Sequence, residues 1–249
     1  MSLSLVEIFF LLIVLFSNIV QAITGFAGTV LAMPVSIELV GYEVARPILN
    51  AIVIPLSIVI MIQNFKYINW KALLFMILFV GIGFGIGFGF SRLPINQHIL
   101  LIIYGALICI VAIAYMFFHL DKLNVPLYIN IPLLIIAGII HFLYTSGGPL
   151  VVIFASHTFK DKKEFRGTLA VMWIILNLIV FIGNIVKNQF TGHIWWLALL
   201  SLISVGIAAV VGHFVVKKLN HNVFMKITYS LLFIVGAITI ILNSISLAK

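Results

Sequence analysis

The sequence predicts an all-α integral membrane protein with about eight transmembrane segments, arranged as two four-segment repeats in which the first segment is broken. Hydrophobic residues make up 64% of the 249 residues and charged residues only 8%, whereas an ordinary soluble domain has about 25% charged residues. Apolar stretches long enough to cross a bilayer follow one another between short loops. Rare residue types recur at a fixed spacing, which indicates duplication. We therefore predict one membrane domain made of two copies, residues 1–122 and 123–249.

Eight apolar blocks, separated by charged residues, account for the predicted segments. The first and fifth blocks run to about 30 residues, which is longer than the roughly 20 residues that a span needs. Each contains a glycine-rich interruption, at residues 24–28 (TGFAG) and 145–149 (TSGGP), so we predict that both are broken helices. The blocks are Leu3–Pro34, Val44–Ile62, Lys71–Phe90, His98–Phe118, Leu127–Ser156, Thr168–Val186, Ile194–Val216 and Val223–Leu247.

Lysine and arginine residues near the block ends predict the orientation, because cytoplasmic loops carry more of them. The odd-numbered loops hold nine lysines and arginines, and the even-numbered loops together with the termini hold five. We therefore expect the odd-numbered loops in the cytoplasm and both termini outside a cell (inner) membrane. The N-terminal stretch MSLSLVEIFF lacks a basic region, so we expect the first block to remain as a membrane helix. The nine are Arg46, Arg92, Lys160, Lys162, Lys163, Arg166, Lys217, Lys218 and Lys226; the five are Lys66, Lys71, Lys122, Lys187 and Lys249.

Rare residues match between the two halves when the sequence is shifted by 120 positions, and by 125 positions after a five-residue insertion. Four spans per copy is an even number, which predicts parallel repeats; a broken block that turns back inside the membrane would change that parity. The matched pairs are Gln21 and His141, Gly28 and Gly148, Arg46 and Arg166, Asn64 and Asn184, and then Trp70 and Trp195, Gly81 and Gly206, Gly87 and Gly212, Arg92 and Lys217, and Tyr104 and Tyr229.

The two breaks are the candidate binding site. Irregular backbone within a bilayer is tolerated where it faces protein or a water-filled cavity. A half-helix that begins after a break has unpaired N–H groups and a partial positive charge, which suit an anion near the middle of the membrane. Glycine allows close approach to that backbone, and Pro149 fits the first turn of such a helix. The alternative is a kink or a tight packing contact, since glycine and proline are common in membrane helices.

Hydrogen-bonding side chains lie beside both breaks. Each of them donates to an anion or, alternatively, bonds to a neighbouring helix. His141 also changes charge near neutral pH, and this would couple transport to protons. The side chains that we assign to the substrate site here are Gln21 and Thr24 with Gly25 and Gly28, and His141, Thr145 and Ser146 with Gly147 and Gly148.

Arg46 and Arg166 complete the predicted substrate site together with Asn50. The two arginines occupy matching positions at the start of the helix that follows each broken block. A guanidinium forms forked hydrogen bonds to an oxyanion; the alternative roles are a loop anchor or an ion pair with Glu38 or Glu43. Asn50 either lines the path or joins helices. The glycine run from Gly81 to Gly89 predicts close helix packing.

Several classes of function lack their residues in this sequence. Only six acidic residues occur and Glu7 alone lies inside a block, so neither a carboxylate relay nor a sodium cage is evident. One cysteine, scattered histidines and no HExxH motif predict no metal site. No P-loop is present, and the basic residues lie between apolar blocks, so we expect no cofactor, no nucleic acid and no enzymatic activity.

The motifs GFAGTVLAMP and TSGGPLVVIF, within two copies of four spans, resemble the TauE/SafE sulfite exporter family of membrane transporters. The similarity extends over nearly the whole chain, although the motifs are short. It implies a secondary carrier for anions such as sulfite, sulfoacetate and related sulfonates, and it implies that Gly25, Gly28, Gly147 and Gly148 belong to the site. The double glycine is intact only in the second motif, so we expect two unequal sites.

We therefore expect a secondary transporter that binds a small, sulfur-containing anion between the two repeats. An anion channel and a non-transporting partner subunit are the alternatives. A channel would pass ions without saturation, and a partner subunit would co-purify with a second protein. The expected partners are the anionic substrate and the lipid bilayer, with a homo-oligomer left open.

Overall fold

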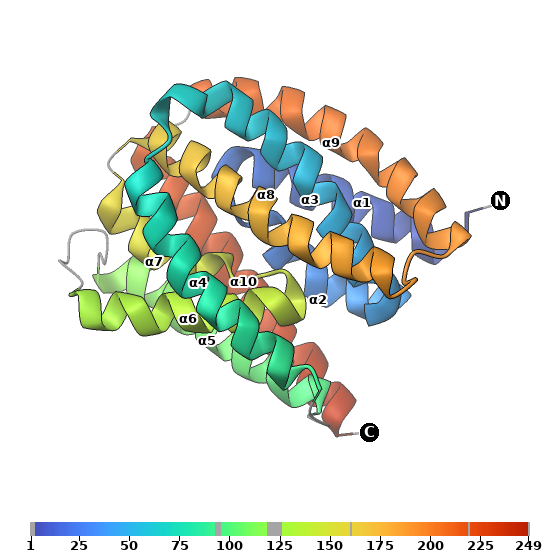
Figure 1. The fold of residues 1–249 in the computed structure, drawn as a ribbon. Coiled ribbons are helices and arrows are strands. Elements are labelled where there is room, and N and C mark those ends of the chain that lie inside the picture. Colours follow the sequence, from blue (N-terminus) through green and yellow to red (C-terminus); the bar gives the residue numbers. More distant parts are fainter. Residues whose placement is uncertain (1–2, 93–95, 119–125, 160, 219, 249) are drawn as a thin grey trace. The chain divides into compact units, whose positions relative to one another are not determined.

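The computed structural model describes residues 3–92, 96–118, 126–159, 161–218 and 220–248 (Figure 1). These residues form α-helices joined by short turns, and no strand occurs among them, which confirms the predicted all-α class. The helices are α1 (Leu5–Thr24), α2 (Gly28–Val40), α3 (Tyr42–Asn64), the short 3-10 helix η1 (Phe65–Tyr67), α4 (Trp70–Phe90), α5 (Gln97–Phe118), α6 (Leu127–Tyr144), α7 (Gly148–Thr158), α8 (Lys162–Val186), α9 (Gly192–Lys218) and α10 (His221–Leu247).

Eight helices in the described part of the chain are long and apolar enough to cross a membrane, which confirms the predicted number of spans. The two remaining apolar helices, α2 and α7, are shorter and directly follow the predicted breaks. Each long block is therefore two helices. The first is interrupted between Thr24 and Gly28, and the second between Tyr144 and Gly148.

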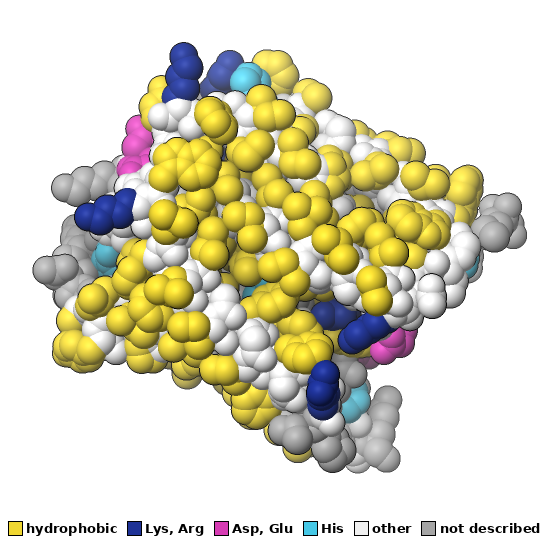
Figure 2. Space-filling model, viewed as in Figure 1, with side chains coloured by type: hydrophobic (Ala, Val, Ile, Leu, Met, Phe, Trp, Pro, Cys, Tyr) yellow, Lys and Arg dark blue, Asp and Glu magenta, His cyan; other side chains and the backbone are white. Residues whose placement is uncertain are grey.

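Large apolar side chains cover the outward faces of the spanning helices. Leu74 is 67% exposed and Ile203 is 63% exposed, although such side chains are usually buried in soluble proteins. Figure 2 shows hydrophobic side chains over most of the visible face, with the lysines, arginines and acidic residues near its margins. This distribution suits a surface in contact with lipid tails.

The chain forms two compact units, and each combines segments from both halves of the sequence. The first unit, Met1–Phe75 with Asp161–Leu219, contains α1, α2, α3, α8, α9 and the start of α4. Within it, α1 packs along α9 and α3 packs along α8. Close approach of α1 and α9 depends on Gly212, because a Cβ atom there would lie 2.5 Å from the Cβ atom of Ala22.

The second unit, Met76–Lys160 with Asn220–Lys249, contains most of α4 together with α5, α6, α7 and α10. Here α5 packs along α10. The predicted packing role of the glycine run is confirmed at Gly83 and Gly87, which face the backbone of α6 so closely that a Cβ atom would collide with it. The three alternating glycines, Gly81, Gly85 and Gly89, have no neighbour within 4 Å of an added Cβ atom.

Candidate functional site

The first break, in the first unit, bends the chain through a left-handed residue. Gly25 has φ +88° and donates its N–H to the carbonyl of Gln21 at 2.7 Å, which ends α1. L-residues rarely adopt this conformation, whereas glycine does so freely. A Cβ atom on Gly25 would also lie 3.2 Å from Cγ of Arg166. Glycine at this position therefore permits both the turn and the close approach of α8.

Two of the predicted ligand side chains hold this break together. Gln21 Oε1 accepts the N–H of Gly28 at 2.7 Å, while its amide nitrogen donates to the carbonyl of Gly25 at 3.4 Å. Thr24 Oγ1 accepts the N–H groups of Phe26 at 3.4 Å and Ala27 at 3.1 Å. These donors lie where the sequence predicts free N–H groups for an anion. Side chains already satisfy them in this structure, as they do at many helix starts.

Arg166 brings a positive charge to the same break. Its side chain is only 5% exposed and its Nη2 donates to the carbonyl of Ala22, in the last turn of α1, at 2.5 Å. Its Nε has no hydrogen-bond partner, and no carboxylate of the described residues pairs with it. A buried charge without a counter-ion is costly. An anion beside this guanidinium would therefore be favourable.

A polar network continues from the break along α8. Trp173 Nε1 donates to the carbonyl of Gly25 at 2.9 Å, and the Asn177 amide donates to the carbonyl of Trp173 at 2.8 Å. Asn50, on α3, donates its amide to Oδ1 of Asn177 at 2.8 Å. The predicted site residue Asn50 is thus connected to Gly25 through two residues of α8, and it joins two helices as the alternative interpretation expects.

The sequence interpretation missed Trp173, although a signal for it exists. Arg166, Trp173, Asn177 and Asn184 follow one another at intervals of seven, four and seven residues, which places them on one face of a helix. A face with arginine, indole and two amides in an otherwise apolar span marks a functional or packing surface. All four residues are buried.

Arg46 lies at the opposite end of the α3 and α8 pair from Arg166. Its Nη1 donates to Oδ1 of Asn184 at 3.3 Å, and its guanidinium lies 5.8 Å from the centre of the Tyr42 ring. Asn184 is 18 residues beyond Arg166 on α8, which corresponds to about 27 Å of helix. The structure therefore does not bring the two predicted arginines together, and one small anion cannot contact both at once.

The second break, in the second unit, has a different construction. Thr145 is left-handed with φ 52° and donates its N–H to the carbonyl of His141 at 2.7 Å. This conformation is uncommon for a non-glycine residue. The hydroxyls of Thr145 and Ser146 both donate to the carbonyl of Tyr144, at 2.7 Å and 2.8 Å. Both predicted ligand hydroxyls thus bond to the local backbone in this structure.

The helix that follows the second break begins at two glycines and a proline. Gly147 is the N-cap residue of α7 and has no side chain of its own to cap the first turn, which contains Gly148 and Pro149. Gly147 packs so closely against the carbonyl of Ala137 that no side chain fits there. Tyr104, which the sequence interpretation did not assign to the site, donates its hydroxyl to the carbonyl of Ser146 at 2.7 Å.

The model of the sulfite exporter TauE/SafE family matches residues 10–239. The chain belongs to this family. No curated protein and no solved structure matches the chain.

Membership of the TauE/SafE family confirms the resemblance that the motifs carry, and both breaks lie inside the matched range. With the eight apolar spans, it makes the chain a multi-pass membrane protein of a transporter family. Within the described residues, no group of three histidine, cysteine or acidic side chains could hold a metal ion.

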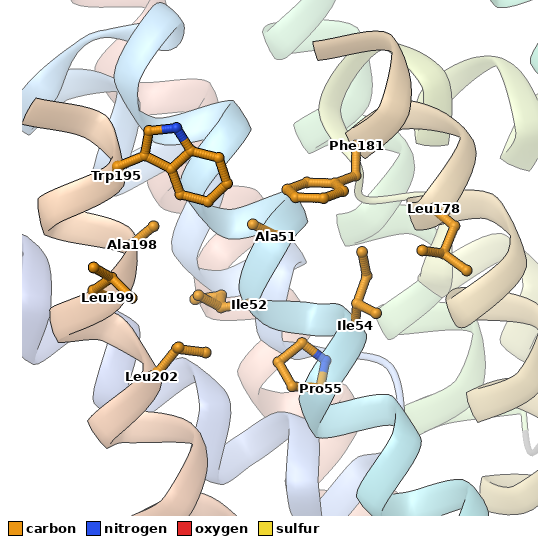
Figure 3. A pocket seen from close by; sticks show the side chains of 10 residues that line it. All are labelled: Ala51, Ile52, Ile54, Pro55, Leu178, Phe181, Trp195, Ala198, Leu199 and Leu202. Carbon is orange, nitrogen blue, oxygen red and sulfur yellow. The ribbon is translucent and has the colours of Figure 1, made fainter. Parts of the chain in front are cut away.

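This TauE/SafE protein also has an apolar pocket of about 280 Å³ between α3, α8 and α9 in the first unit (Figure 3). Ile54, Leu178, Phe181, Trp195 and Leu199 point toward it, and no predicted site residue lines it. An anion would lose its hydration there without gaining polar partners. The pocket suits hydrocarbon, so it is not the candidate anion site.

Proposed function

We propose that this protein is a secondary transporter of a small sulfur-containing oxyanion of the sulfite type. The observation that carries the proposal is the buried Arg166, which lies against the first break with one backbone carbonyl as its hydrogen-bond partner and no paired carboxylate among the described residues. An oxyanion would supply the missing negative charge and accept forked hydrogen bonds from the guanidinium. Family membership supports the transport of such an anion.

The binding residues in this proposal are those of the two breaks. Arg166 supplies positive charge at the first break, where Gln21 and Thr24 form hydrogen bonds with the backbone between Gly25 and Gly28. At the second break, the N-terminus of α7 at Gly148 supplies a favourable helix dipole. His141, Thr145, Ser146 and Gly147 precede that turn in the chain. Arg46 and Asn50, on α3, form a separate part of the proposal, because Arg46 lies beside Asn184, about 27 Å of helix from Arg166.

The burial of these residues favours a carrier over a channel. Thr24, His141, Thr145 and Ser146 are each only 1% exposed. A channel requires a continuous water-filled path with its polar groups along it, whereas a carrier passes through closed states that hide its site. A carrier predicts saturable flux. Single-channel currents above carrier turnover would contradict a carrier. A second protein that co-purifies stoichiometrically and is required for flux would favour the partner-subunit alternative.

Flux measurements with Arg166 variants test the proposal. We expect purified protein in proteoliposomes to take up sulfite with saturation, and Arg166→Ala to reduce the rate about tenfold or more, because a buried charged contact is lost. Arg92→Ala removes an exposed arginine at the end of α4 and should leave flux unchanged. Unchanged sulfite uptake by a folded Arg166→Ala protein would remove Arg166 from the site.

Thermal shift measurements separate binding from transport. A ligand that binds only the folded state raises the melting temperature, so sulfite should stabilise the wild type more than it stabilises Arg166→Ala. Sodium and potassium salts of a large, non-transported anion serve as controls for ionic strength. Stabilisation by a cation with no effect of any oxyanion would contradict an anionic substrate.

A further inference from the structure

Helix boundaries repeat along the chain at the spacing that the rare residues indicate. The first helices of the two halves end at Thr24 and Tyr144, and the short helices begin at Gly28 and Gly148. The helices α3 and α8 also begin 120 residues apart, and the order of exposed, half-buried and buried residues over their first turns is the same. Boundaries and burial are independent of the residue matches, and they support a duplication.

The chain reverses direction at the first break. At one end of the first unit, the start of α1 meets the start of α9, where His193 Nε2 lies 2.7 Å from Oε1 of Glu7. The start of α3 meets the end of α8, where Arg46 bonds to Asn184, and residues 187–191 alone separate α8 from α9. Both α1 and α3 therefore begin at this end, so α2 must run back between them. Among the described residues, each half thus has five α-helices, an odd number.

Corresponding helices pack antiparallel in the first unit. Near the start of α3, Arg46 bonds to Asn184 near the end of α8. Near the end of α3, Asn64 lies beside the start of α8, where a Cβ atom on Gly167 would be 3.0 Å from the Asn64 side chain. Because α3 and α8 occupy matching places in the two halves, opposite directions mean that the halves themselves are inverted.

Corresponding helices in the second unit show the same relation. Along α5, His98 lies 2.9 Å from the Asn243 side chain of α10. Further along α5, Cys109 lies 3.6 Å from the carbonyl of Phe233. At a still later turn, the Tyr115 ring stacks on Tyr229 at 4.0 Å. Residue numbers rise on α5 as they fall on α10, so this pair is also antiparallel.

We infer that the chain consists of two five-helix copies of opposite orientation in the membrane. The sequence alone predicts parallel copies unless a broken block turns back, and the contacts of α1, α2 and α3 favour that exception. An odd number of helices brings the chain into the second copy from the other side of the bilayer.

The basic residues of the first unit agree with this arrangement. The end of the first unit where α8 begins has seven lysines and arginines, and the end where α1 begins has two. This bias is stronger than the nine against five of the eight-span count. By the positive-inside rule the richer end is cytoplasmic, and the start of α1 lies outside. The seven are Lys66, Lys71, Lys162, Lys163, Arg166, Lys217 and Lys218; the two are Arg46 and Lys187.

Inversion gives the two arginines separate roles. This consequence rests on the proposed function, whereas the inverted topology does not. Arg166 lies toward the cytoplasmic end of α8. Arg46, on α3, lies beside Asn184 near the outer end of α8, about 27 Å along that helix from Arg166. A substrate would meet one arginine from each side of the membrane. The sequence grouped both arginines into one substrate site, and inversion divides them between two stations, one for each side of the membrane.

Cysteine labelling tests the inversion without any transport measurement. The single cysteine, Cys109, is first changed to alanine. Glu43→Cys and Lys163→Cys are then made separately, since these exposed residues occupy matching positions in the two halves. In right-side-out vesicles, an impermeant maleimide should label Glu43→Cys directly and Lys163→Cys only after permeabilisation. Labelling of both from the same side would overturn the inversion.

A second pair guards against variants that fail to fold. His193→Cys and Lys217→Cys mark the two ends of α9, so they must label from opposite sides and show that the assay discriminates. His193→Cys should label together with Glu43→Cys, and Lys217→Cys together with Lys163→Cys. Grouping of Glu43 with Lys217 would overturn the arrangement of the first unit. Failure of sulfite flux would leave the labelling result standing, so the two proposals fail separately.

Discussion

Gly25 and Arg166 show how a site forms from residues 141 positions apart in the sequence. The left-handed turn at Gly25 stops α1, which leaves the last carbonyls of α1 without helical partners. Arg166 then donates to one of them, the carbonyl of Ala22, and a cation at a helix C-terminus is favourable. The remaining donors of the guanidinium are those that the proposed function assigns to an anion.

A substitution at Gly25 tests the turn. Gly25→Ala should destabilise the protein by about 1–2 kcal/mol, because an L-residue is strained in the left-handed region, and its Cβ atom would crowd Arg166. The apparent melting temperature in detergent measures this. Gly183→Ala, in α8 with open space around it, should instead be neutral or stabilise by up to about 1 kcal/mol. Equal effects of the two variants would contradict a special conformation at Gly25.

Gln21 is predicted to stabilise the break even when no anion is present. Gln21→Ala removes the acceptor of the Gly28 N–H and should cost about 1–2 kcal/mol, as for the loss of other helix caps. Gln63→Ala removes an exposed glutamine of α3 and serves as the control in the same melting assay. If Gln21→Ala weakens sulfite binding without lowering stability, then Gln21 is a ligand more than a structural cap.

At the scale of elements, glycine spacing on α4 decides which face contacts another helix. The positions Gly83 and Gly87 are four residues apart and share a face, and both contact α6 so closely that no Cβ atom fits. The neighbouring glycines at 81, 85 and 89 share another face with open space. Small residues allow backbones to approach in a membrane, where no hydrophobic effect drives helices together.

Matched alanine variants on α4 test this division. Gly83→Ala should lower stability by about 1–3 kcal/mol, because its methyl group would collide with the Ile135 carbonyl and force α4 away from α6. Gly85→Ala, two positions away with no neighbour, should be neutral or slightly stabilising. Thermal unfolding of the two proteins in the same detergent gives the comparison. A larger loss for Gly85→Ala would mean that its open face packs against another molecule.

At the scale of the whole molecule, inversion predicts that the two arginines act from different sides. In oriented vesicles, Arg46→Ala should raise the half-saturating sulfite concentration about tenfold on the outer side, where α3 begins. Arg166→Ala should do so on the cytoplasmic side. Arg92→Ala is again the control. Equal effects of both variants on both sides would favour a single shared site over two stations.

The predicted spans and breaks needed only local information. Apolar length sets where a helix crosses, and glycine with proline marks where it stops, so the interruptions before Gly28 and Gly148 were visible in the sequence. Of the candidate site, the same signal found Gln21, Thr24 and the residues at 145–148 as neighbours of the breaks. It did not reveal that Gln21 and Thr24 bond to the backbone of the break, since both a ligand and a cap need the same polar atoms.

The sequence by itself thus determined the membrane class, the eight spans, the two breaks and the family, because composition and spacing along the chain encode all of these. Tertiary structure decided whether the chain bends or reverses at the first break. A glycine permits either a bend or a reversal of the chain, and contacts such as Arg46 with Asn184 and His193 with Glu7 show which direction the helices around the first break take. Distance between residues far apart in the sequence is likewise a tertiary property. Arg46 and Arg166 therefore occupy matching positions in the sequence and yet lie at opposite ends of the α3 and α8 pair.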